Sequence, residues 1–113
     1  MRSTGYAAVW QDAGLAMAGR ILVDAGALDF EGAGGGRRAS RHISYTAIVS
    51  SRLGRAVSDR IGGRPTLVLE LTDGEVIRIS TPELGALHEL EEALRDQVQR
   101  DRALVDDGAV LGR

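Results

Sequence analysis

Apolar and polar residues alternate through much of the chain before Pro82, which is the pattern of half-buried β-strands. The clearest run is 66–72, where Leu67, Leu69 and Leu71 fall on one side. Successive side chains of a strand point to opposite faces of a sheet, so such a run buries one face. The pattern predicts seven short antiparallel strands, at residues 6–10, 16–23, 27–31, 41–45, 47–53, 66–72 and 75–80.

Turn signals separate these runs. Asp73-Gly74 is the preferred pair for a two-residue type I′ turn, which needs positive φ at both positions, and it predicts a hairpin between the last two strands. Segment 32–36 is glycine-rich, and segment 54–64 is closed by Gly62-Gly63. Because glycine makes regular structure costly in backbone entropy, we expect loops at both segments.

After Ser80 the spacing of apolar residues changes from two to three and four, which is typical of an amphipathic helix. Ser80 or Thr81 is expected to cap the helix start, with Pro82 at the first helical position in the second case. The helix is predicted to end near Arg102 and to be followed by a short flexible tail at 103–113. The apolar stripe expected to dock on the sheet consists of Leu84, Leu87, Leu90, Leu94 and Val98.

A length of 113 residues corresponds to one domain, assigned to residues 1–102. Seven strands of this length curl into a barrel or form two packed sheets, and one amphipathic helix covers an opening. The predicted fold is therefore mainly β: a seven-stranded antiparallel barrel, or two packed sheets, capped by a C-terminal amphipathic helix. The absence of Cys excludes disulfides, thiolate metal ligands and thiol catalysis. No apolar run is long enough to span a bilayer.

Several short motifs follow one another along most of the chain. They are Gly-Arg-Ile-Leu-Val at 19–23, Leu-Asp-Phe-Glu-Gly at 28–32, Ile-Ser-Tyr-Thr-Ala-Ile at 43–48, Arg-Pro-Thr-Leu-Val-Leu at 64–69, Asp73-Gly74, and the Leu-rich helix. In this order they resemble the bacterial PH-like domains of the pleckstrin-homology and GRAM type. The resemblance implies a PH-like barrel. It also implies a non-enzymatic interaction or scaffold module without a cofactor, since most PH-like domains outside the phosphoinositide-binding subset act through protein contacts. The first residues lack the apolar run of a secretory signal, so a cytoplasmic protein is expected.

The 14 arginines are unevenly distributed, and the chain has no Lys. Seven lie between positions 37 and 64 against one acid, Asp59, so this segment carries a charge of +6 while the whole chain carries −2. Guanidinium groups form paired hydrogen bonds with phosphate and carboxylate, so one interpretation is a site for an anionic ligand, such as a phosphate or a lipid headgroup at a membrane surface. The other interpretation is a set of solvated loop arginines. The candidate ligand-binding residues are Arg37, Arg38, Arg41, Arg52, Arg55, Arg60 and Arg64.

The first hairpin loop, 11–15, has no basic residue. The PH domains that bind phosphoinositides carry a basic-x-Arg pair on that hairpin, so headgroup binding at their usual site is not expected here. A protein partner is therefore the main prediction, and a peripheral membrane or anionic-ligand adaptor is the alternative.

Other chemistry has little support in the sequence. Segment 32–36 lacks the Lys-Ser/Thr of a phosphate-binding loop, and no nucleophile elbow is present. His42 and His88 lack the spacing of a metal-binding pair, so we predict no catalytic residue and no metal. Few aromatic residues and a nearly balanced charge disfavour nucleic acid. A homo-oligomer formed through an exposed edge strand is a further possibility, with 6–10 as the candidate edge.

Overall fold

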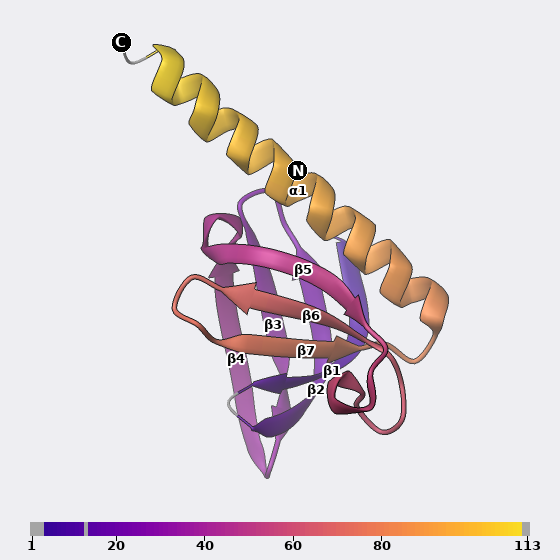
Figure 1. Ribbon diagram of the computed structural model, residues 1–113. Coiled ribbons are helices and arrows are strands. Elements are labelled where there is room, and N and C mark those ends of the chain that lie inside the picture. The colour runs from indigo at the N-terminus through magenta and orange to yellow at the C-terminus, as the bar shows by residue number, and fades with distance from the viewer. Residues whose placement is uncertain (1–3, 13, 112–113) are drawn as a thin grey trace.

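The computed structural model describes residues 4–12 and 14–111 and has seven antiparallel strands followed by one long helix (Figure 1). Two single-turn 3₁₀ helices, η1 and η2, flank the fifth strand. The elements are β1 (Thr4–Asp12), β2 (Leu15–Val23), β3 (Ala27–Gly34), β4 (Arg37–Ser44), η1 (Tyr45–Ala47), β5 (Ile48–Gly54), η2 (Val57–Asp59), β6 (Thr66–Leu71), β7 (Val76–Ser80) and α1 (Leu84–Leu111). The predicted fold class, mainly β with one C-terminal helix, is confirmed.

The strands form one curled sheet, a half-barrel, in the order β4-β3-β2-β1-β7-β6-β5. The expected edge at Tyr6–Trp10 is wrong, because β1 lies in the middle of the sheet, between β2 and β7. Its pairing with β7 joins residues about 70 positions apart, which a local pattern does not reveal. Within the described residues, β4 and β5 each have a strand neighbour on one side only, so they are the edges.

A glycine pair lies at a close approach between β2 and β3. Gly19 of β2 and Gly32 of β3 are register partners. A Cβ on Gly19 would lie 2.1 Å from the carbonyl oxygen of Glu31, and a Cβ on Gly32 would lie 2.4 Å from that of Ala18. Since a side chain does not fit at either position, glycine lets the backbones of β2 and β3 approach closely.

The core lies on the concave side of the sheet, and the first half of α1 covers it. Four predicted stripe residues of the helix are buried: Leu87, Leu90, Leu94 and Val98. Leu84 is an exception, with 53% of its surface exposed, because it stands at the first position of the helix. Trp10 packs edge-on against Phe30, with ring centroids 5.2 Å apart.

The ends of several elements differ from the sequence-based expectation. β3 continues to Gly34 and β4 begins at Arg37, so only Gly35 and Gly36 form the turn, both with positive φ. The β6–β7 turn contains three residues rather than two: the Gly74 amide donates to the Leu71 carbonyl, and the Leu71 amide donates to the Glu75 carbonyl. Gly74, at φ 89°, takes the left-handed position that follows a type I turn in three-residue hairpin loops.

The helix also begins and ends later than expected. Its first residue is Leu84; Ser80 belongs to β7, and the Thr81 hydroxyl donates to the Glu83 carbonyl at 2.5 Å, so neither residue caps the helix. The helix extends to Leu111, nine residues beyond Arg102. Residues 103–111, which were expected to belong to a tail, lie within it.

Candidate functional site

The free edge of β5 is the first candidate site, and the hydrogen bonding of β6 defines it. The Leu71 amide donates to Glu75 on the β7 side, and the Thr72 amide donates to Ala47 on the β5 side. Alternate residues of an antiparallel strand hydrogen-bond to opposite neighbours, so Thr66, Val68 and Glu70 also pair with β5. Their register partners are Gly54, Arg52 and Ser50.

It follows that Ser51 and Leu53 direct their backbone N–H and C=O groups away from β6, toward the open edge. A bulge between Ile48 and Ser50 leaves Val49 out of register. The Val49 carbonyl accepts a hydrogen bond from Nη2 of Arg102 at 3.2 Å, which ties the helix to this end of the strand. Polar backbone groups at an uncovered edge are available to another strand.

A groove of about 120 Å³ separates this edge from α1. Its strand side includes Val49, which is 52% exposed, and its helix side includes Val98, Gln99 and Arg102. Arg95, also on the helix side, forms an ion pair with Glu91 one turn earlier. The groove therefore combines apolar contacts from Val49 and Val98, a free strand edge and two helix-borne arginines, of which Arg102 already holds a strand carbonyl.

The seven arginines of the basic segment have different surroundings. Arg41 forms an ion pair with Glu75 at the β6–β7 turn, and Arg52 Nη1 lies 3.1 Å from Asp59 Oδ2. Arg60 donates to the carbonyl oxygens of Arg55 and Gly63. Four of the seven, including Arg64, thus bind groups of the protein itself.

The remaining three arginines are more open. Arg37 and Arg38 begin the edge strand β4, and Arg55 lies in the loop after β5; all three are exposed. Across residues 4–12 and 14–111, the structure shows no hydrogen bond or ion pair from their side chains. Arg37 and Arg38 were expected in a loop and instead form part of a regular strand.

Asp59 organises the loop between β5 and β6. Its side chain is only 9% exposed, and Arg78 of β7 reaches it from a second direction, with Nε 3.4 Å from Oδ1. Hydrogen bonding by Arg52 lowers the pKa of the Asp59 carboxyl, against the opposing effect of burial, and Arg78 lowers it further. The Thr66 hydroxyl donates to the Asp59 carbonyl at 2.6 Å. The sequence contained a signal for this role, because Asp59 is the one acid among seven arginines.

The two histidines are not brought together with acids in a metal-binding geometry. His42 Nδ1 lies 2.6 Å from Asp29 Oδ1 across the β3–β4 pair, and its side chain is exposed. The described part of the chain holds no group of three or more His, Asp or Glu residues that could bind a metal ion. Of the helices in that part, none has the length and apolarity needed to cross a membrane.

No family model matches the sequence, and no curated protein is significantly similar to it. The geometry of the chain itself is therefore the basis for any functional assignment. The β5 edge was not foreseen in the sequence. The polar Ser50-Ser51-Arg52 run within an otherwise apolar strand was the available signal, since central strands of a sheet seldom contain one.

Proposed function

We propose that this protein is a non-enzymatic interaction module that binds an extended segment of another protein along the free edge of β5. Strand addition of this kind uses main-chain hydrogen bonds for affinity and pockets for alternate side chains for specificity. The observation that carries the proposal is the pair of outward-facing backbone positions, Ser51 and Leu53, beside a groove that α1 borders.

The side chains around the groove favour a particular kind of segment. Val49 and Val98 offer apolar contact, while Arg102 carries positive charge. We expect a segment in which apolar residues alternate with polar or acidic ones, because successive side chains of an added strand point to opposite sides.

The wider proposal is that the chain is a PH-like domain of a bacterial cytoplasmic protein. The curled antiparallel sheet and the helix packed across its open side support the PH-like part. The non-enzymatic part is supported by the arginines at 41, 52, 60 and 64, which bind the protein's own carboxylates and carbonyls.

The proposal is tested first by selecting binders from random decapeptides displayed on phage. The best binder is then titrated into the ¹⁵N-labelled full chain. We expect the amide signals of Ser51 and Leu53 to shift and to become protected from hydrogen exchange. Ser51→Pro should weaken binding at least about tenfold, because proline removes the edge donor and its ring obstructs an added strand.

Ser40→Pro is the matched control. The two-residue turn makes Gly34 and Arg37 a hydrogen-bonded pair, so alternation directs the Ser40 amide to the other free edge of the sheet, on β4. Equal thermal stability of the two variants shows that both still fold. Unchanged binding by Ser51→Pro, or loss of binding with Ser40→Pro instead, contradicts the proposal. The membrane adaptor is supported instead if no peptide binds and the protein sediments with phosphatidylserine vesicles. This sedimentation should weaken with salt and depend on Arg37 and Arg38.

A further inference from the structure

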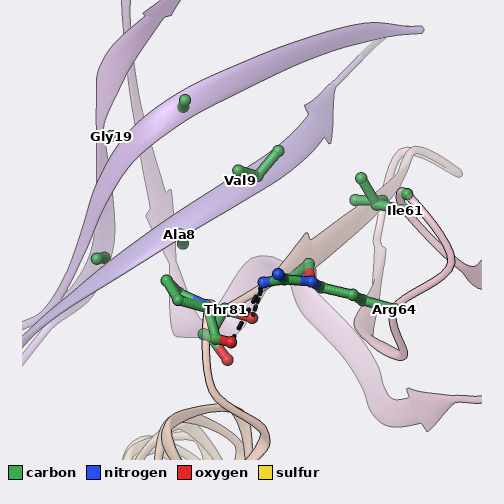
Figure 2. A pocket seen from close by; sticks show the side chains of 11 residues that line it. Ala8, Val9, Gly19, Ile61, Arg64 and Thr81 are labelled. Carbon is green, nitrogen blue, oxygen red and sulfur yellow. Dashed lines mark hydrogen bonds between the residues drawn. The ribbon is translucent and has the colours of Figure 1, made fainter.

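A hollow of about 370 Å³ lies beside β1, where the chain leaves β7 on its way to α1 (Figure 2). One wall is formed by β1 and β2, a second by the loop 61–64, and a third by the linker that contains Thr81. Its apolar lining residues are Ala7, Ala8, Val9, Ala18, Ile61 and Pro82. This hollow shares no residue with the groove beside β5.

The walls of the hollow are preformed. The side chains on β1 and β2 are small, with Gly19 among them, so the strands leave space above their backbones. The loop is a tight turn in which Ile61 and Arg64 exchange two backbone hydrogen bonds, of 3.1 and 3.0 Å, with Gly62 and Gly63 at positive φ. A loop held in this way does not need to become ordered when a ligand binds, and the binding cost is reduced accordingly.

Arg64 supplies the charge at this site. Figure 2 shows its side chain extending from the loop toward Thr81, below the strand that carries Ala8 and Val9. Its Nη1 donates to the carbonyl oxygens of Pro82 at 3.2 Å and Thr81 at 3.5 Å, which positions the guanidinium. For its Nε and Nη2 the structure shows no acceptor among the described residues, and no acidic residue lines the hollow. The site therefore has an apolar floor and two available hydrogen-bond donors, Nε and Nη2 of Arg64.

We propose that the hollow binds a small carboxylate that carries an apolar tail, of the size of a medium-chain fatty acid. The carboxylate accepts from Nε and Nη2 of Arg64, a planar pair of donors that matches two carboxylate oxygens. The alkyl chain lies against Ala7, Val9 and Ile61. The charge complementarity with Arg64 selects an anion, and the lining selects an aliphatic group over a strongly hydrated one such as free phosphate.

Titration of the ¹⁵N-labelled full chain with sodium octanoate tests this proposal, with 1-octanol and acetate as probes that lack the charge or the tail. We expect saturable millimolar binding of octanoate, since a ligand of this size has few atoms to contribute. Amide shifts should be largest at Val9, Ile61, Arg64 and Thr81. Octanol and acetate should each bind at least about tenfold more weakly.

Two variants localise the site. Ala7→Leu fills the hollow from an exposed position of β1, keeps the charge of Arg64 and should abolish octanoate binding. Ala16→Leu alters an exposed alanine of β2 outside the lining and should leave binding unchanged. Arg64→Gln removes the charge and should weaken octanoate binding while leaving octanol unaffected. The proposal is overturned if octanol binds as tightly as octanoate, if Ala7→Leu still binds octanoate saturably, or if the amide signals of Val9, Ile61, Arg64 and Thr81 do not shift. None of these results bears on peptide binding at β5.

Discussion

Arg52 of β5 holds the buried carboxylate of Asp59 at 3.1 Å, so an arginine from the basic segment fixes the loop that follows its own strand. Arg78 and Asp59 add a second ion pair from β7. The loop between β5 and β6 is thus fastened to two strands by a single carboxylate. In the sequence Arg52 and Asp59 belong to a cationic segment, whereas in the fold they form a structural cluster with Arg78.

We expect Asp59→Asn to lower the midpoint of thermal unfolding at pH 7 because it leaves Arg52 and Arg78 without their anion. The folded-state pKa of Asp59 lies below its ordinary value of 3.8, so the carboxylate stabilises the fold above that pH, and the contribution is lost as pH falls through the folded pKa. The difference in stability between wild type and variant should be constant from pH 7 to about pH 5 and then shrink in acid. Denaturant unfolding at several pH values measures it, and a pH-independent difference contradicts the ion-pair explanation.

Tyr45→Phe should cost about 1 kcal/mol of stability at neutral pH, because the Tyr45 hydroxyl donates to the Asp24 carbonyl at 2.5 Å. Burial, followed by the charge of Asp24, raises the pKa of this phenol above its ordinary value of 10. Because the pKa of Tyr45 is higher in the folded than in the unfolded state, the protonated phenol stabilises the fold. This stabilisation is present at neutral pH and is lost as the pH rises beyond 10 through the pKa of the folded state. Wild type should therefore lose its advantage over the variant in alkali. Tyr6→Phe is the control, and an equal effect there would contradict the role of the hydrogen bond.

The glycine pair between β2 and β3 gives a third prediction. Gly19→Ala should destabilise the protein by about 1–3 kcal/mol or more, because the added methyl group meets the backbone of β3 rather than a movable side chain. Gly26→Ala places its methyl group in open space, without a positive φ, and should change stability little. Chemical denaturation of both variants measures the difference, and similar stabilities would show that β2 and β3 separate easily.

The docking of α1 gives a fourth prediction. Leu90 is fully buried, so Leu90→Ala should cost about 2–5 kcal/mol, and Leu90→Asp should detach the helix from the sheet. Leu84→Ala should stay within about 0.5 kcal/mol of wild type, because Leu84 is largely exposed. Circular dichroism and denaturant unfolding follow both changes. A large cost at Leu84 would mean that the helix start packs more closely than described.

Local patterns in the sequence predicted the seven strands, the helix and most of the helix stripe, because alternation and helical spacing record which face of an element is buried. They did not predict which strands lie at the edges. The neighbour of β1 on one side is β7, and the pairing of Trp10 with Ile79 depends on the whole chain. The type of turn at Asp73-Gly74 was also missed, since the same dipeptide serves a three-residue loop when the first residue of the pair keeps a negative φ.

The candidate sites show the same division. Composition identified an arginine-rich segment, but only the structure separates Arg52, which binds Asp59, from Arg37 and Arg38, which begin an edge strand. The groove beside β5 and the hollow beside Arg64 each join segments that are distant in sequence. No spacing rule brings such segments together, because their meeting depends on the curl of the sheet and the direction of α1.

Trp10 is the single tryptophan of the chain, is only 2% exposed, and stands where β1 joins β7 and contacts Phe30 of β3. Its intrinsic fluorescence consequently reports on the junction between the two halves of the sheet without any engineered label. A red shift of its emission marks the entry of water at that junction. A ligand that binds in the groove beside β5 or in the hollow beside Arg64 without a red shift of Trp10 emission therefore leaves the sheet closed.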